Sequence, residues 1–261
     1  MKRISIITPV WVDSKERHEE LLRCIESVKN QTFRGSYEYI IVNDGSIIPV
    51  EIPKYPFIKV VNQANLNRVT AYNTGLKEAK GEIICLLDSD DEYDPKYLCS
   101  VDKWFKEYPE YKMFNFGCKY IHKDGGVSER EAFAPKEEKI GHEDFGGGQI
   151  VNGTFVFHRS VYDELGAYPP HDVKDIDCSA INYSKGPREL HMTSPYDFSA
   201  YAQMEFPALR EFFFIDKVSE PNKIIKELGN PWGNDFFIFY KYTRKFHSKP
   251  MRENFLYLVH P

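Results

Sequence analysis

Short apolar runs alternate with amphipathic helical segments over about the first 108 residues, and this alternation constrains the fold more than any other feature. The runs are rich in Ile and Val, have the length of strands, and read "RISIITPV", "YEYIIVNDGS", "FIKVVNQ" and "EIICLL". Helical spacing is expected after Asp13, over residues 68–80, and after Pro95. The order strand, helix, strand, strand, helix, strand, helix predicts an α/β fold with a mostly parallel sheet and helices on both faces.

Local signals mark where two of these helices begin. Asp13 with Glu16 three residues later resembles a capping box, and Asp94 followed by Pro95 predicts an N-cap and first-turn pair. The apolar face of the helix after Pro95 is expected to be Tyr97, Leu98, Val101, Trp104 and Phe105. The second half predicts strands in "KMFNFGCKYIHKDGG", "TFVFHRS", "REFFFID" and "ENFLYLVH", helices in "SVYDELG" and "NDFFIFYKYTRKF", and an irregular segment at about 167–231.

Length, charge and cysteine usage limit the function classes. A chain of 261 residues suits one large α/β domain, and a net charge of -5 without a long basic stripe excludes nucleic acid as the expected partner. The five cysteines form no paired spacing, which favours a reducing compartment. Pro9 and Asp13 interrupt the first apolar run, so it predicts a strand rather than a signal peptide. No run reaches the ~20 apolar residues of a membrane span, so the expected location is the cytoplasm, with peripheral contact at the inner membrane surface as an alternative.

Polar residues follow three of the predicted strands at the point where each strand ends. They are Thr8-Pro9, Asn43-Asp44 and the run from Asp88 to Asp91. The carboxyl ends of parallel strands meet at one edge of a sheet, where ligands bind, so we expect these clusters to converge. Five of the seven residues from Asp88 to Asp94 are acidic, and such a cluster needs either a cation or free access to water. The simpler interpretation of the acidic cluster is a solvated loop with a helix cap. The more specific interpretation is a site for a divalent metal ion.

Other phosphate and metal motifs do not fit the sequence. A calcium-binding EF-hand loop that starts at Asp88 needs a glycine at its sixth position and a glutamate at its twelfth, but Tyr93 and Cys99 stand there. The P-loop pattern and the GxGxxG dinucleotide pattern are both absent.

Three segments together resemble the nucleotide-binding half of the family-2 glycosyltransferases. They are "ISIITPVW", "YIIVNDGS" and "NLNRVTAYNTGLKEAKGEIICLLDSDDEYDPKYL", which cover residues 3–105 in the family's order and spacing, with LDSDD as its DxD motif. The resemblance implies a GT-A fold and an inverting transferase. Such an enzyme moves a sugar from a nucleotide-diphosphate donor, usually UDP-linked, to an acceptor hydroxyl with Mn2+ or Mg2+.

The acidic motif supplies the metal-site candidates that the resemblance implies. Asp90 and Asp91 match the positions that face ribose, diphosphate and metal, whereas Asp88 begins the motif and orients the loop. Asp88, Ser89 and Asp90 are also the nucleotide-binding candidates of this motif. Carboxylate oxygens suit Mg2+ and Mn2+, and a bound ion would offset their mutual repulsion. His260, at the end of the last predicted strand, is a further metal or phosphate candidate, although a lone histidine is more often structural.

The strand ends supply the candidates for binding the nucleotide base. Asp44 matches the family's aspartate that hydrogen-bonds uracil, although an aspartate before a glycine is also common in plain turns. Thr8, Pro9 and Val10 are expected to line the base pocket, Pro9 and Val10 through their backbone.

The start of the second predicted helix supplies the diphosphate candidates. Asn67, Arg68 and Asn73 correspond to the stretch in which the family's side chains reach the diphosphate or brace the DxD loop. An exposed arginine at a helix start is the simpler interpretation of Arg68.

The general base has two candidates. "PWGNDFFIFYKYTR" resembles the family's helix start that carries a Glu-Asp pair, with Asn234 in place of the glutamate, so Asp235 is the first candidate. Asp175 in "VKDIDCS" is the second, because its distance after "LGAYPP" is closer to the family's usual spacing. About sixty residues separate Gly166 from Trp232, which departs from the family pattern.

The sequence therefore predicts a nucleotide-sugar-binding subdomain over residues 1–110 and an acceptor-binding subdomain over residues 111–261. The expected acceptor is a glycan, a lipid-linked molecule or a protein. One alternative is a sugar nucleotidyltransferase, although the glycine- and basic-rich phosphate loop of that class is missing after the first strand. A second alternative is a nucleotide-sugar-binding protein without catalysis, because Asn234 replaces the expected glutamate.

Overall fold

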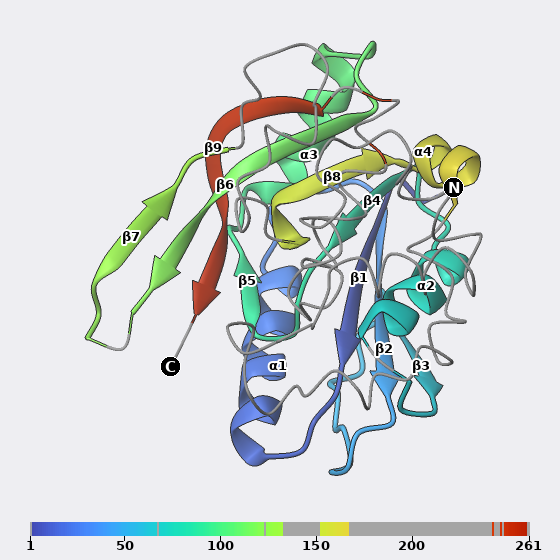
Figure 1. Ribbon diagram of the computed structural model, residues 1–261, viewed down its shortest axis with the longest axis vertical. Helices are drawn as coiled ribbons and strands as arrows, with labels where there is room; N and C mark the ends of the chain where they lie inside the picture. The colour runs from blue at the N-terminus through green and yellow to red at the C-terminus, as the bar shows by residue number, and fades with distance from the viewer. Residues whose placement is uncertain are drawn as a thin grey trace, which may run out of the picture.

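The computed structural model describes residues 2–66, 68–122, 124–132, 152–166, 242, 246 and 248–259. The described chain contains nine strands, which all belong to one sheet, and four α-helices (Figure 1). The elements follow one another in the order β1 (Ile4–Val10), α1 (Lys15–Lys29), β2 (Tyr37–Asp44), β3 (Ile58–Gln63), α2 (Arg68–Glu78), β4 (Ile83–Leu86), β5 (Asp91–Tyr93), α3 (Tyr97–Glu107), β6 (Met113–Ile121), β7 (Val127–Arg130), the short 3-10 helix η2 (Asn152–Thr154), β8 (Phe155–His158), α4 (Arg159–Leu165) and β9 (Ser248–Val259).

The sheet has a parallel half and a mixed half. Its strand order is β3-β2-β1-β4-β8-β6-β9-β5, and β7 pairs with β6 outside this path. The pairs β3-β2, β2-β1 and β1-β4 are parallel, and so is β6-β9. Strands β5, β7 and β8 introduce antiparallel pairs with β9, β6 and β4. The predicted strands and helices over the first 108 residues all appear in the predicted order, and the structure adds one short strand, β5, inside the acidic loop.

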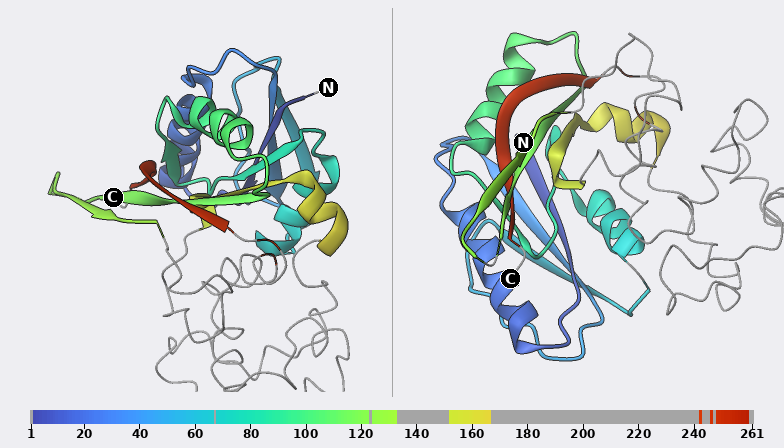
Figure 2. Two further views of the ribbon diagram at one scale, coloured as in Figure 1. Left: turned by 90° about the horizontal axis from the view of Figure 1, so that it is seen from above. Right: turned by 60° about the vertical axis from the view of Figure 1, so that its left-hand side comes forward.

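Helices cover both faces of the sheet, as predicted (Figure 2). Alternate residues of the same strand enter different layers: Ile6 packs with α1 and α3, whereas Ile7 packs with α2 and α4. This alternation follows from the two-residue period of a strand. Gly75 lets α2 lie directly on β1, because a Cβ there would stand 2.3 Å from the Ile7 Cγ2 atom.

The starts of two helices differ from the predicted caps. Helix α1 is capped by Ser14, whose side chain accepts a hydrogen bond from the Arg17 backbone N–H, and not by Asp13. Helix α3 has its N-cap at Lys96 without a side-chain cap bond, while the carboxylate of Asp94, two residues earlier, accepts the Lys96 backbone N–H at 2.8 Å. Both predictions failed by one or two residues because several polar residues compete for one helix start.

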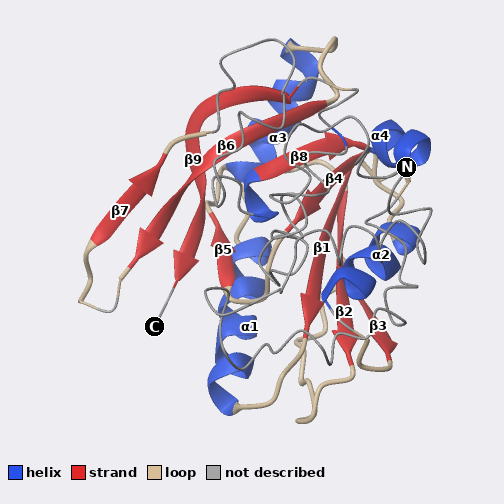
Figure 3. Cartoon of the chain, in the orientation of Figure 1, coloured by secondary structure: helices blue, strands red, loops and turns tan. Residues whose placement is uncertain are grey.

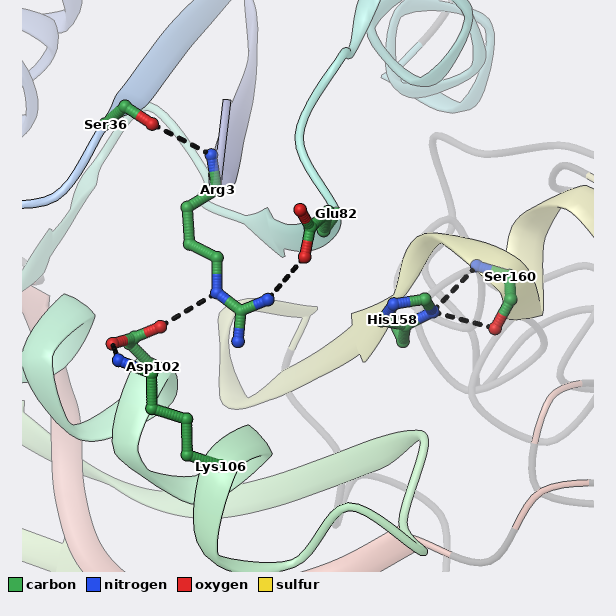
Figure 4. Close-up of polar contacts among 7 residues, drawn as sticks. All are labelled: Arg3, Ser36, Glu82, Asp102, Lys106, His158 and Ser160. Carbon is green, nitrogen blue, oxygen red and sulfur yellow. Dashed lines mark hydrogen bonds and ion pairs between the residues drawn. The ribbon is translucent and has the colours of Figure 1, made fainter. Parts of the chain in front are cut away.

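A charged cluster ties the amino ends of β1 and β4 to α3 (Figure 4). Arg3 lies just before β1, and its guanidinium contacts Asp102 of α3 at 2.8 Å and Glu82, before β4, at 2.5 Å. Lys106 also contacts Asp102 at 2.6 Å. This cluster stabilises the sheet edge that is opposite to the strand ends predicted to bind a ligand.

The described part of the second half agrees with its predicted elements (Figure 3). The expected strands appear as β6, β8 and β9, and the expected short helix as α4, which ends at Gly166 with a positive φ of 73°. The segments "REFFFID" and "NDFFIFYKYTRKF" fall outside the described residues, apart from Tyr242 and Phe246. None of the described helices combines the length and the apolar character needed to cross a membrane.

Candidate functional site

The loops that follow β1, β2 and β4 are joined at the carboxyl edge of the sheet. The Val12 carbonyl accepts the backbone N–H groups of Ile47 and Ile48 at 2.9 and 3.1 Å, and the Ser46 hydroxyl accepts the Val12 N–H at 2.8 Å. Strand β4 continues this arrangement, because the Leu87 N–H donates to the Ile7 carbonyl at 3.0 Å. The three polar clusters therefore lie at one edge of the sheet.

Asp44, at the end of β2, is a buried carboxylate held by one of its two oxygens. Its Oδ1 accepts the Gln63 Nε2–H at 2.6 Å and the Leu66 backbone N–H at 3.0 Å, and only 4% of the residue is exposed. No described residue donates a hydrogen bond to Oδ2. Gly45 follows with a φ of 66°, and a Cβ there would lie 2.5 Å from the Asn65 backbone nitrogen. Asp44 is therefore a fixed acceptor, held more firmly than an ordinary turn aspartate.

The end of β1 contributes backbone rather than side chains to this edge. Thr8 is fully buried, and its hydroxyl accepts a hydrogen bond from the Tyr39 hydroxyl at 3.0 Å on the α1 side. The Tyr39 hydroxyl is also 3.4 Å from the Cys24 sulfur atom, and burial raises the pKa of Tyr39 well above its usual value. Pro9 and Val10 are also buried. These positions can reach a ligand mainly through their peptide groups.

Asp88 lies two residues after the end of β4, beyond the buried Leu87, and is held by two residues of α2. Its Oδ1 accepts a hydrogen bond from the Tyr72 hydroxyl at 2.8 Å, and its Oδ2 lies 3.6 Å from Arg68 Nη1. Its backbone carbonyl accepts the Asp91 N–H at 3.2 Å and a contact from the Cys24 sulfur at 3.5 Å. Both the backbone and the carboxylate of Asp88 are thus fixed.

Asp90 and Asp91 follow, and they differ in exposure. Asp91 opens β5 opposite Leu258 of β9 and is 3% exposed, whereas Asp90 is half-buried, as is Ser89. Burial raises the pKa of the Cys24 thiol, and the negative charges of Asp91 and Asp90 raise it further. Asp90 is the carboxylate of this pair that a ligand can reach more easily.

The acidic loop could hold a divalent ion only together with other ligands. Among the described residues, no group of three or more His, Cys, Asp or Glu side chains is arranged to hold a metal ion. Mg2+ usually takes one or two protein carboxylates and completes its coordination with water and substrate phosphates. The half-buried carboxylate of Asp90 fits that kind of site, and its hard oxygen ligands suit Mg2+ or Mn2+.

Strand β9 holds the acidic loop through hydrogen bonds to Asp94. The Asp94 backbone N–H donates to the Phe255 carbonyl at 2.8 Å, and the Tyr257 hydroxyl donates to Asp94 Oδ2 at 2.5 Å. Burial and this hydrogen bond raise the pKa of Tyr257 to about 12. The strand ends at Val259, one residue before His260, and its Leu258 pairs with Asp91. A segment far along the sequence therefore fixes the loop that carries Asp90.

Comparison with known proteins decides the family. The profile described as "Glycosyl transferase family 2" matches residues 5–166, which is more than half of the chain. The chain belongs to this family. It is 36% identical over 105 residues to the uncharacterized glycosyltransferase YwdF of Bacillus subtilis, covering 39% of this chain and 37% of YwdF. It is also 35% identical over 116 residues to the poly(ribitol-phosphate) beta-N-acetylglucosaminyltransferase TarP of Staphylococcus aureus, covering 41% of this chain and 34% of TarP.

The solved structures agree on the fold. Residues 1–349 of Staphylococcus aureus TarS superpose with a TM-score of 0.57 at 13% identity, covering 98% of this chain and 60% of that structure. A second structure of the same TarS fragment, in complex with UDP, gives a TM-score of 0.55. Family membership and this likeness confirm the predicted GT-A fold. The chain spans only about a third of the length of the curated relatives that it matches.

Several residues expected to act in a family-2 glycosyltransferase are placed by the structure, and others are not. Asn73 lies on α2 and is buried, with 4% of the residue exposed. Four candidates lie outside the described residues: Asn67, Asp175, Asp235 and His260. The roles assigned to them remain predictions.

Two residues at this edge were missed by the sequence reasoning. Tyr72 was not singled out, because an aromatic residue in an amphipathic helix indicates core packing and its hydroxyl gives no local signal. Trp11 directly follows Val10, and its indole nitrogen is buried without a hydrogen-bond partner among the described residues. The Arg17 guanidinium lies 5.9 Å from the Trp11 ring. A tryptophan immediately beyond a strand that ends where the polar clusters converge was the available signal.

Proposed function

We propose that this family-2 glycosyltransferase transfers a sugar from a UDP-linked donor to an acceptor hydroxyl with inversion at the anomeric carbon. The observation that carries this proposal is the meeting of the loops after β1, β2 and β4, which brings Asp44, Asp88, Asp90 and Arg68 to one edge of the sheet. The TarS complex with UDP, a protein of the same fold, supports a uridine nucleotide as the ligand.

In this proposal, Asp44 recognises the uracil base of the donor. Its Oδ1 is engaged by Gln63 and the Leu66 backbone, which leaves Oδ2 to accept the N–H of uracil. A charged acceptor forms a stronger hydrogen bond than a neutral one and cannot donate to a ring nitrogen. The site should therefore favour uracil over cytosine, whose ring nitrogen at the same position is itself an acceptor.

The diphosphate lies between α2 and the acidic loop. Helix α2 begins at Arg68 with no acidic residue in its first turn, so its amino end and the guanidinium both favour an anion. Asp90 would hold Mg2+ or Mn2+, with Asp91 close behind it. Such an ion, when bound, neutralises the charge that develops on the leaving diphosphate.

The remaining half of the chain would supply the acceptor and the base. Asp235, or Asp175 as the second candidate, removes the proton of the acceptor hydroxyl while that oxygen attacks the anomeric carbon and the bond to the UDP oxygen breaks. A glycan or a lipid-linked molecule fits the family, and the name of TarP states a poly(ribitol-phosphate) acceptor for that relative. Contact with the inner membrane surface belongs to the same proposal.

Calorimetric titration with UDP, GDP, CDP and ADP, each with Mn2+ and with a chelator, tests the donor site. We expect selective UDP binding that needs the metal, and an affinity loss of at least about tenfold in Asp90→Asn, since a lost metal-ligand contact weakens binding on this scale. Glu92→Gln is the matched control, because Glu92 belongs to the same acidic run but pairs with Arg23 at 3.5 Å. Equal binding of all four nucleotides, or none by a folded sample, would refute the proposal.

A second measurement separates an enzyme from a protein that only binds the nucleotide. UDP release from a UDP-sugar should depend on an added acceptor. It should fall sharply in either Asp235→Asn or Asp175→Asn, while the UDP affinity of both variants stays within about twofold of wild type. Retained turnover in both variants would exclude both residues as the base.

A further inference from the structure

We infer that Tyr72 is a positioning residue for diphosphate binding: its hydroxyl fixes the Asp88 carboxylate, which in turn sets the direction of the Arg68 guanidinium. This inference rests on the proposed donor site and adds a specific residue to it. The juxtaposition that carries it is a buried tyrosine of α2 whose hydroxyl meets the first aspartate of the acidic loop at 2.8 Å.

The Asp88 carboxylate divides its two oxygens between two residues of the same helix. Tyr72 donates to Oδ1, and Arg68 Nη1 lies 3.6 Å from Oδ2. Residues four apart on a helix share one face, so Arg68 and Tyr72 approach Asp88 side by side. With both oxygens engaged in this way, Asp88 acts as an anchor for Arg68.

The tyrosine hydroxyl is not required for packing. Tyr72 is 1% exposed and its ring packs among the apolar side chains between α2 and the sheet, including Ile7, Leu76 and Leu86. A phenylalanine would fill the same space. A hydroxyl at such a depth needs a hydrogen-bond partner, and Asp88 provides one at the surface of this layer. The Tyr72 hydroxyl therefore serves to orient the Asp88 carboxylate.

Arg68 is the member of this group that a ligand can reach. Its side chain is 29% exposed, whereas that of Asp88 is 15% exposed. The guanidinium has more N–H donors than one carboxylate oxygen can accept, so it can bind Asp88 and a phosphate oxygen together. Without the tyrosine hydroxyl, Asp88 is free to rotate and to take two N–H groups of Arg68 for itself. The arginine would then turn away from the phosphate.

This arrangement predicts a loss that is specific for phosphate. Tyr72 acts through Asp88 and Arg68, which face the diphosphate, whereas Asp44 faces the base at a different strand end. Removing the Tyr72 hydroxyl should weaken UDP binding and leave uridine binding unchanged. A tyrosine with only a packing role would affect both ligands equally or neither.

The experiment compares wild type, Tyr72→Phe, Arg68→Ala and the double variant, with UDP followed by calorimetry and uridine by NMR titration, both in Mn2+. We expect Tyr72→Phe to raise the Kd for UDP about tenfold, the size typical of a lost contact behind a binding residue. The Kd for uridine should stay within about twofold. In the Arg68→Ala background, Tyr72→Phe should have little further effect on UDP, because its target is gone.

Tyr242→Phe is the matched control for deleting a buried hydroxyl. Tyr242 packs in the same layer and donates to the Gly166 carbonyl at 2.9 Å, away from the strand ends. Its UDP affinity should equal that of wild type. Equal losses for UDP and uridine in Tyr72→Phe, or additive effects in the double variant, would overturn the inference while leaving the donor site intact. Failure of wild type to bind UDP would overturn both.

Discussion

At the scale of single residues, Asp44 allows a direct test of base recognition. In Asp44→Asn, the amide oxygen can still accept the hydrogen bonds from Gln63 and the Leu66 backbone, so the fold should be retained. The amide nitrogen then replaces Oδ2 and presents a donor where uracil needs an acceptor. We expect UDP affinity to fall about tenfold or more, and the preference for UDP over CDP to shrink or reverse, as measured by calorimetry.

The hairpin between β6 and β7 supplies the control for this substitution. Asp124, like Asp44, precedes a glycine with a positive φ, and its carboxylate accepts the Gly126 backbone N–H at 2.8 Å in an exposed turn. Asp124→Asn should change neither nucleotide affinity. If Asp44→Asn behaved in the same way, Asp44 would be only a turn residue, and the assignment of the base site to this strand end would be wrong.

At the scale of elements, the start of helix α4 depends on a neutral histidine. His158 Nδ1 accepts the Ser160 backbone N–H at 3.2 Å (Figure 4), and burial, with the positive charge of Lys112, lowers the pKa of His158 from its usual value of 6.5. Below pH 6.5 the unfolded state therefore binds more protons than the folded state. The free energy of unfolding should fall as the pH decreases from 6.5 towards the lower pKa of the folded state.

Urea unfolding at pH 7.5, 6.5 and 5.5 measures this contribution in wild type and in two variants. His158→Asn keeps a capping oxygen but does not titrate, so its unfolding free energy should fall less steeply between pH 7.5 and 5.5 than that of wild type. His158→Ala removes both the cap and the titration, so it should be less stable at pH 7.5. Identical slopes in wild type and His158→Asn would show that this histidine does not couple the helix to pH.

Some features of the helices and strands could be predicted from the sequence, and others could not. Apolar period and strand-end polarity are local signals, so the order of elements and the convergence of Asp44 with Asp88–Asp91 were predictable. The cap of α1 was not, because Asp13 and Ser14 have similar capping strength. The start of α3 was not either, because Asp94 accepts the Lys96 backbone N–H before the helix and Lys96 makes no side-chain cap bond. The contact of Tyr72 with Asp88 spans 16 residues and depends on how α2 packs on the sheet.

At the scale of the whole molecule, two strands join the two proposed subdomains into one sheet: β8, which pairs with β4, and β9. Strand β9 pairs with β6 on one side and with β5 on the other, so a strand from residues 111–261 completes the sheet next to the acidic loop of residues 1–110. This long-range pairing could not be read from "ENFLYLVH" alone, because an apolar run predicts a strand without naming its neighbours. The sheet is therefore continuous across residue 110, where the two proposed subdomains meet.

A core substitution in β9 tests whether both halves unfold together. Leu256 is fully buried, pairs with Tyr93 of β5 and with Cys118 of β6, and packs against Gly153. Leu256→Ala should lower the free energy of unfolding by about 2–5 kcal/mol, the range for a large-to-small change in a core. Because β9 contacts both halves, tryptophan fluorescence and circular dichroism should report one shared urea transition, displaced equally by the substitution. Two separate transitions, with only one displaced, would instead mean that residues 1–110 fold independently of β9 and that its hydrogen bonds to Asp94 do not set the stability of the acidic loop.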